Sequence, residues 1–119
     1  MEAKELLRIQ HEVASERNPE KRRAAIERAY VEDVRFLDSH ADVMGRQAFS
    51  DRLQDILDGA PPDFVLEEDG PPYVGPDTAA QPWRFGPPGN PMIRGLDVLT
   101  LRDGKVSVVR GLIAAPGTT

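Results

Sequence analysis

The sequence predicts an α+β fold in which helices lie on one side of a largely antiparallel sheet. Three segments in the first half of the chain carry apolar residues at helical spacing. The dipeptide Asp103-Gly104 separates two long apolar segments, which is typical of a two-residue hairpin turn. One short segment between the second and third helices has a period of two. Helices followed by a meander of strands are typical of the α+β class.

The expected helices occupy the first half of the chain. Asn18 suits a helix cap and Pro19 a first helical position, so the first two helices separate there. The third helix opens after Gly45 and ends at residues 59–62. The apolar stripes of the three helices are Leu6, Ile9 and Val13; Ile26, Ala29 and Tyr30; and Phe49, Leu53, Ile56 and Leu57.

Five strands are expected, at residues 34–38, 64–67, 79–85, 92–102 and 105–114. The segments at 70–77 and 86–91 are rich in proline and glycine and are expected to be loops near a pocket or an interface. The tail, residues 116–119, is expected to fray.

Length and composition indicate one globular domain over residues 1–119. Hydrophobic residues make up 39% of the chain, and cysteine is absent. Disulfide and thiol chemistry are therefore excluded, and a cytoplasmic location is expected. No segment approaches the roughly 20 apolar residues that cross a membrane, and the charged start of the chain does not resemble a signal peptide.

Charge and motif content exclude several other functions. The net charge is −5 and the arginines are scattered, which argues against nucleic-acid binding. The two histidines have no metal-ligand spacing. There is no glycine-rich phosphate loop and no serine in a nucleophile motif. We therefore expect neither a metal nor a cofactor.

Asp38 is the first candidate for chemistry. Val34, Phe36 and Asp38 alternate along a strand, so all three side chains point to the same face. A carboxylate that faces an apolar pocket is disfavoured as an anion, which makes it a better base near neutral pH or an acid that stays protonated. The alternative is that Asp38 caps the turn at residues 39–40.

Asp97 is the second candidate. Its neighbours Leu96, Val98 and Leu99 are apolar, so its strand is expected to be buried on both faces. A carboxylate in such a strand needs a partner or a chemical role. Arg84 and Arg110 are the candidate partners across the sheet.

Three stretches in the same order carry a family resemblance: AYVEDVRFLD at residues 29–38, Gly45-Arg46, and GLDVLTLRDGKVSVV at residues 95–109. With them, the chain resembles the NTF2-like superfamily, in particular its SnoaL-like and ketosteroid-isomerase-like branch. The resemblance implies three helices packed on a strongly bent, mixed sheet that forms a cone around one deep pocket. This superfamily includes enzymes and binding proteins, so the fold does not settle the function.

The resemblance also implies roles for particular residues. Asp38 matches a general base, and Asp97 matches a protonated carboxyl that donates a hydrogen bond to an oxyanion. The branch has a second oxyanion donor, a tyrosine, in the first helix, where the nearest match in this chain is His11. His11 is alternatively a surface or core histidine. Leu53 stands where the family often has another tyrosine.

The expected function is proton abstraction next to a carbonyl in a small to medium hydrophobic substrate, giving isomerisation or aldol-type cyclisation without a cofactor. Tyr30, Phe36, Trp83 and Leu99 are expected to form the substrate pocket, although core packing alone also explains such residues.

The alternative is a non-catalytic ligand-binding or dimerisation module, which an arginine lying on Asp38 would favour. Epoxide hydrolysis is less expected, because Gly111 follows Arg110 where that group carries an acid.

A homodimer is expected through the outer face of the sheet. The last two strands carry apolar residues on both faces, and one layer of helices covers only one of them. The residues concerned are Leu96, Val98, Val106, Val108, Val109 and Ile113.

Overall fold

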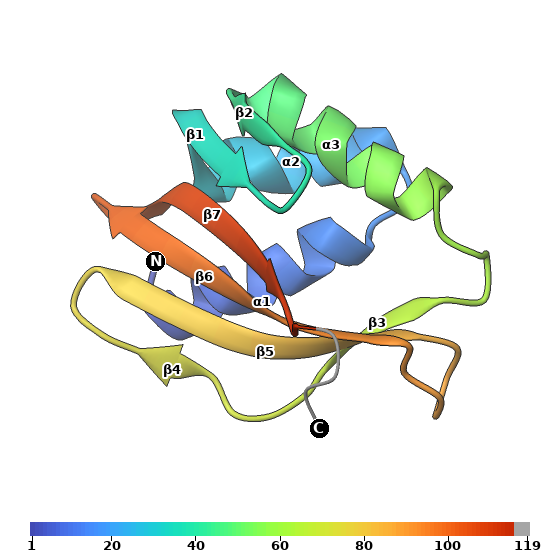
Figure 1. The fold of residues 1–119 in the computed structure, drawn as a ribbon. Helices are drawn as coiled ribbons and strands as arrows, with labels where there is room; N and C mark the ends of the chain where they lie inside the picture. Colours follow the sequence, from blue (N-terminus) through green and yellow to red (C-terminus); the bar gives the residue numbers. More distant parts are fainter. Residues whose placement is uncertain (116–119) are drawn as a thin grey trace.

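The computed structural model describes residues 1–115 and has three helices on one face of a curved sheet (Figure 1). The helices are α1 (Ala3–Ser15), α2 (Pro19–Ala29) and α3 (Arg46–Asp58). The strands are β1 (Tyr30–Leu37), β2 (Asp42–Met44), β3 (Val65–Glu68), β4 (Tyr73–Val74), β5 (Thr78–Gly86), β6 (Ile93–Arg102) and β7 (Lys105–Ile113). The expectation of a frayed tail concerns residues 116–119, which lie outside the described residues.

The helix boundaries follow the local signals in the sequence. The Asn18 side chain accepts hydrogen bonds from the amides of Glu20 and Lys21, and Pro19 opens α2. Gly45 has a φ of 102°, a left-handed backbone conformation that glycine adopts without strain, and it turns the chain into α3. Tyr30 was expected to end the second helix, but it is the first residue of β1.

The sheet has the strand order β2-β1-β7-β6-β5-β3, with β4 paired to β5. Strands β5, β6 and β7 form the expected antiparallel meander, and Asp103-Gly104 makes the hairpin turn with positive φ at both residues. The N-terminal strand β1 joins β7 in parallel, so the sheet is mixed. Strand β4 lies in a segment that was expected to be a loop, and β2 was not among the expected strands. Each pairs at an exposed edge over two or three residues.

Two irregularities curve the sheet around the helices. The register between β1 and β7 shifts between Tyr30 and Arg35, and the register between β6 and β7 shifts between Thr100 and Leu101. Such bulges bend a strand and increase its twist. The concave face that results packs against all three helices, and the core lies between these two layers (Figure 1).

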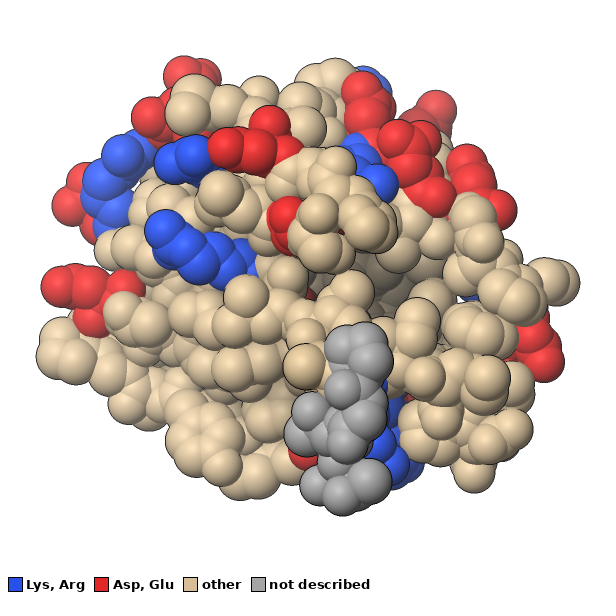
Figure 2. Space-filling view, viewed as in Figure 1, with Lys and Arg blue, Asp and Glu red and all other residues tan. Residues whose placement is uncertain are grey.

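Charged side chains are unevenly distributed over the face of the molecule seen in Figure 2. Figure 2 shows Lys, Arg, Asp and Glu gathered over the helices, whereas the region over β4 and β5 is mostly uncharged. The apolar residues of the last two strands were expected on both faces of the sheet. Val106 and Val109 both lie on the inner face, fully buried against the helices, because the bulge in β6–β7 changes the alternation. The apolar side chains that face outward are Leu96, Val98, Val108 and Leu112.

Candidate functional site

A pocket of about 250 Å³ lies between the concave face of the sheet and helices α1 and α3. Its apolar wall includes Phe36, Leu53, Ile56, Leu57, Leu66, Trp83, Phe85, Ile93 and Ile113. Its polar residues are Gln10, Asp38, Ser39, His40, Arg52 and Asp97. Both aspartates predicted from the sequence therefore reach one mainly apolar cavity.

Asp38 lies directly after β1, and its side chain enters the pocket beside Phe36, as the alternation predicts. One carboxylate oxygen, Oδ1, accepts a hydrogen bond from the backbone amide of His40 at 2.8 Å. The other, Oδ2, accepts from Arg52 Nε at 3.0 Å and lies 2.9 Å from Arg52 Nη2. Asp38 thus caps its turn and also forms a largely buried ion pair with an arginine of α3.

Asp97 lies on β6 at the centre of the concave face, and no arginine in residues 1–115 pairs with it. Its Oδ1 accepts a hydrogen bond from Trp83 Nε1 at 3.0 Å, and its Oδ2 accepts from Gln10 Nε2 at 3.3 Å. The prediction that Arg84 or Arg110 pairs with Asp97 across the sheet is wrong. Arg84 instead lies beside carboxylates on the outer face, and Arg110 is exposed.

The two carboxyls therefore differ in environment. Burial raises the pKa of Asp97 to about 6, and the hydrogen bonds from Gln10 and Trp83 oppose this rise. No cation within hydrogen-bonding distance compensates the negative charge of Asp97 in residues 1–115. Asp97 can consequently exchange a proton near neutral pH. The Asp38 carboxylate, in contrast, forms an ion pair with Arg52.

A buried chain of hydrogen bonds orients Gln10. The hydroxyl of Tyr30 donates to Gln10 Oε1, which leaves the amide group of Gln10 to donate to Asp97. Tyr30 is fully buried, and its pKa lies well above the ordinary value because of burial and the nearby Asp97 charge. Tyr30 therefore orients Gln10 toward Asp97 through its hydroxyl group.

Of the four residues expected to form the substrate pocket, Phe36 and Trp83 line the cavity, and their contact with a substrate stays a prediction. Tyr30 and Leu99 are fully buried in the core and lie behind the wall instead of lining it. The position of Trp83 depends on Gly95, its partner on β6. A Cβ at Gly95 would come within 2.2 Å of the indole ring, so only glycine lets the ring lie across β6.

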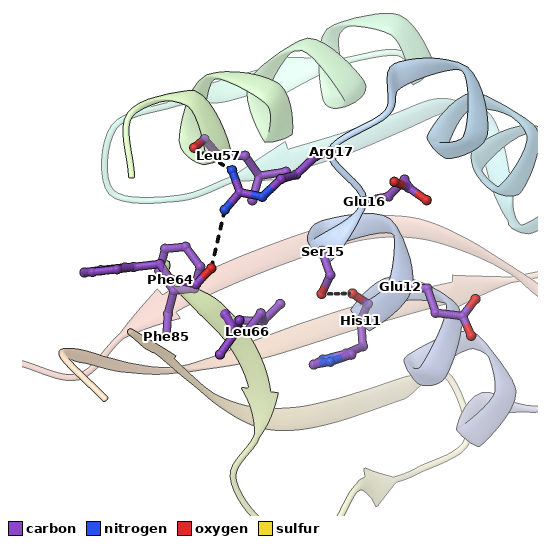
Figure 3. Close-up of a pocket in the computed structure, with 10 residues that line it drawn as sticks. His11, Glu12, Ser15, Glu16, Arg17, Leu57, Phe64, Leu66 and Phe85 are labelled. Atoms are coloured by element: carbon purple, nitrogen blue, oxygen red, sulfur yellow. Dashed lines mark hydrogen bonds between the residues drawn. The ribbon is translucent and has the colours of Figure 1, made fainter. Parts of the chain in front are cut away.

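His11 does not join the two aspartates, contrary to the expectation. Successive residues on a helix are rotated by about 100°, so Gln10 faces the pocket while His11 faces a second hollow. This hollow of about 520 Å³ is also lined by Glu12, Ser15 and Arg17 (Figure 3). Gln10 therefore occupies the place that was assigned to His11.

Gly111 separates the two aspartates. It pairs with Asp97 across β6 and β7. A Cβ on Gly111 would lie 3.7 Å from Asp38 Cβ and 3.8 Å from Asp97 Oδ1. The missing side chain leaves an open position over β7 that a ligand atom can occupy between the two carboxyls.

Sequence reasoning missed two residues of the site, Gln10 and Arg52. Gln10 lies on the apolar stripe of α1 with Leu6 and Val13, and a polar residue on such a stripe is a usable signal. Arg52 is one of many charged residues on α3, and nothing in its spacing distinguishes it. Only the packing of α3 against β1 brings it to Asp38.

Within residues 1–115, no group of three or more His, Asp or Glu side chains is arranged to hold a metal ion. None of the helices in this part of the chain is long and apolar enough to span a bilayer.

The fold and the site define a class: an α+β domain with a bent sheet, a helical layer and one carboxylate-bearing pocket between them. The sequence model of the SnoaL-like domain matches residues 12–109, so the chain belongs to the SnoaL-like family. No curated protein matches the sequence significantly.

Solved structures share this fold at low sequence identity. A candidate isomerase of the SnoaL-like family from Agrobacterium tumefaciens is 21% identical, with a TM-score of 0.85 over 92% of this chain and 95% of that chain. A candidate ketosteroid isomerase from Kribbella flavida is 19% identical, with a TM-score of 0.72 over 96% and 78%. A candidate polyketide cyclase from Sinorhizobium meliloti is 17% identical, with a TM-score of 0.71 over 90% and 93%.

Proposed function

We propose that the protein is a cofactor-independent enzyme that transfers a proton at the carbon next to a carbonyl group. Its substrate is a small to medium hydrophobic molecule, and the outcome is isomerisation or aldol-type cyclisation. The observation that carries this proposal is Asp97, a carboxyl without a cation partner whose pKa is raised to about 6 in a mainly apolar pocket. A base is most effective when its pKa lies near the working pH.

We assign the proton transfer to Asp97. With a pKa of about 6 it is mostly ionised at pH 7, and it gains a proton readily when the substrate excludes water. Gln10 and Trp83 hold its two oxygens in fixed positions. A carboxyl that takes a proton from one carbon and returns it to another performs an isomerisation.

We assign to Arg52 the stabilisation of the negative charge that develops on the substrate oxygen. Its guanidinium group has five N–H donors, and only the Nε and Nη2 groups face Asp38. The remaining donors are available for a carbonyl oxygen that enters the pocket. Asp38 then positions Arg52. The sequence-based assignment of Asp38 as the base competes with this one, and the ion pair with Arg52 argues against it.

The test is exchange of solvent deuterium into the α-carbon of apolar ketones, followed by proton NMR. The wild-type protein should accelerate the exchange, and Asp97→Asn should lower the rate by about 10²- to 10⁴-fold. Asp38→Asn should lower it less. Asp63→Asn, which removes an exposed loop carboxylate, is the matched control. A full loss of exchange in Asp38→Asn with little loss in Asp97→Asn would restore the original assignment.

A second candidate is a non-catalytic ligand-binding module. The ion pair between Asp38 and Arg52 favours it, because the pair gives the Asp38 carboxylate a structural role. Saturable binding of ketones without any exchange above the uncatalysed rate would support this function and overturn the enzymatic one.

We also propose a homodimer formed through the outer face of the sheet. The outward-facing Leu96, Val98 and Val108 are half-buried, and Leu112 is 50% exposed. An uncovered apolar surface of this kind favours association with a second copy of the same chain. A cytoplasmic location stays a prediction from the cysteine-free composition.

A further inference from the structure

The catalytic pocket and the hollow that contains His11 are neighbours. We call the latter the distal groove; His11, Ser15, Arg17 and Phe64 lie along it (Figure 3). Leu57, Leu66 and Phe85 line both cavities. These three apolar side chains therefore form the partition between the pocket and the groove.

The partition consists of side chains from three different elements. Leu57 belongs to the last turn of α3, while Leu66 on β3 pairs with Phe85 on β5. The ring of Phe64 packs edge-on against Phe85, with ring centroids 5.1 Å apart. Side chains change rotamer without movement of the backbone, so this partition can open while the sheet and helices stay in place.

We propose that the pocket and the distal groove form one continuous binding site for an elongated apolar ligand. The proposal rests on the proposed function for one end: the carbonyl lies over Gly111, between Asp38 and Asp97. The apolar body of the ligand passes between Leu57, Leu66 and Phe85, and its far end lies beside His11. The substrate class is thus a long-chain ketone or a related carbonyl compound.

The chemistry of the groove defines the far end of the ligand. Arg17 already donates to the backbone carbonyls of Leu57 at 3.5 Å and Phe64 at 3.4 Å. The other charged side chains of the groove, Glu12 and Glu16, are acidic. An anionic end group is therefore disfavoured, and His11 can bond to an uncharged hydroxyl or carbonyl.

The chain contains a built-in reporter for each end of this site. Trp83 is its single tryptophan and lines the pocket. Of its two histidines, His40 lines the pocket and His11 lines the groove. Tryptophan fluorescence and the imidazole NMR signals of the two histidines therefore show separately which part is occupied.

The experiment is a titration of the full chain with 2-alkanones of increasing chain length. Each added methylene that is buried should tighten binding by about fourfold. Short ketones should change the signals of Trp83 and His40 alone. Long ketones should also shift His11, and all three signals should saturate together at one equivalent.

Two variants test the partition itself. Leu66→Phe narrows the passage, so the gain in affinity with each added methylene should stop at a shorter chain length than in the wild type. Val74→Phe, on exposed β4 and outside both cavities, should behave as the wild type. The histidine measurement on the wild type needs no variant, so the test survives if Leu66→Phe does not fold.

A His11 signal that never shifts at saturation, or that shifts only with a second equivalent of ketone, would overturn the proposal. These results are separate from those of the deuterium exchange. Exchange without a His11 shift refutes the continuous site alone. A His11 shift without exchange refutes the enzymatic function and keeps the continuous site.

Discussion

Gly111 on β7 stands directly opposite Asp97 on β6, and a methyl group on Gly111 would lie within 4 Å of both Asp97 and Asp38. The two carboxyls come from strands on either side of β7, so the residue on β7 decides whether the space between them is open. Glycine keeps it open. A substitution at Gly111 should therefore weaken ligand binding strongly and change the stability of the fold only slightly.

Gly111→Ala should fold with a free energy of unfolding within about 1 kcal/mol of the wild type. Its Cβ would make contacts of 3.7 to 3.8 Å, which are ordinary van der Waals distances, and alanine restricts the unfolded chain more than glycine does. Ketone binding should weaken by about tenfold or more, because the methyl group occupies the space between the carboxyls. Denaturant titration and fluorescence of Trp83 measure the two effects.

Gly95→Ala is the contrasting variant on the neighbouring strand. Here a Cβ would lie 2.2 Å from the Trp83 ring and 2.4 Å from a backbone carbonyl, so the variant should lose several kcal/mol of stability. Equal stability losses for the two alanine variants would contradict this account of the β5–β7 surface.

The contribution of Asp97 to the stability of the protein should fall as the pH rises from about 4 to about 7. The pKa of Asp97 is raised from 3.8 to about 6 in the folded state, so the folded protein binds more protons than the unfolded chain in this range. The rise corresponds to at most about 3 kcal/mol, fully present below pH 4 and lost above pH 6. Asp97→Asn should remove this slope. The measurement is the difference between the unfolding free energies of the two proteins at each pH.

Gln10→Leu should destabilise the fold and raise the pKa of Asp97 further. The buried Tyr30 hydroxyl loses its acceptor, and Asp97 loses one of the two donors that stabilise its charge. An unsatisfied buried polar group costs about 1–3 kcal/mol. Carboxyl NMR of Asp97 and denaturant titration measure both effects. Tyr30→Phe is the control, since it removes the hydroxyl and keeps the donor to Asp97.

The Asp38–Arg52 pair should show a coupling energy of about 1–3 kcal/mol in a double-mutant cycle with Asp38→Asn and Arg52→Met. Only 10% of the Asp38 side chain and 22% of the Arg52 side chain are exposed, so solvent screens this pair less than a surface pair. The exposed pair of Asp33 and Arg102 provides the comparison and should couple more weakly, because solvent screens it. Equal coupling energies in the two cycles would mean that solvent screens the pair in the pocket as strongly as the pair on the surface.

Leu112→Asp should convert the proposed dimer to a monomer. Leu112 lies at 50% exposure on the outer face opposite Leu96, where a charge would be buried without a partner in the interface. Sedimentation should give twice 13.1 kDa for the wild type and 13.1 kDa for the variant. Met44→Asp, an exposed change on β2, should leave the dimer intact. A monomeric wild type at micromolar concentration would refute the proposal.

The helices and most strands could be predicted because their signals are local. The stripe at Leu6, Ile9 and Val13, for example, is buried in the structure, since the period of apolar residues fixes which face a helix must cover. Strands β2 and β4 carry too few residues for any period to show. Their pairing follows from the chain returning past an exposed sheet edge.

The candidate site could be predicted in part. The alternation from Val34 to Asp38 places that carboxyl in the pocket, and Asp97 is found there as well. The partner of each carboxyl could not be predicted. His11 was assigned where Gln10 lies, because a shift of one residue on a helix rotates the side chain by about 100° and moves it to a different cavity.

The sequence by itself therefore determined the three helices, five of the strands, their order and the two candidate carboxyls, because these depend on spacing along one strand or helix. Tertiary structure alone decided that Asp38 meets Arg52 of α3, while Asp97 meets Gln10 of α1 and Trp83 of β5. Proton affinity depends on burial and on charges within a few ångströms. Those neighbours come from distant parts of the chain, so only their packing raises the pKa of Asp97 to about 6.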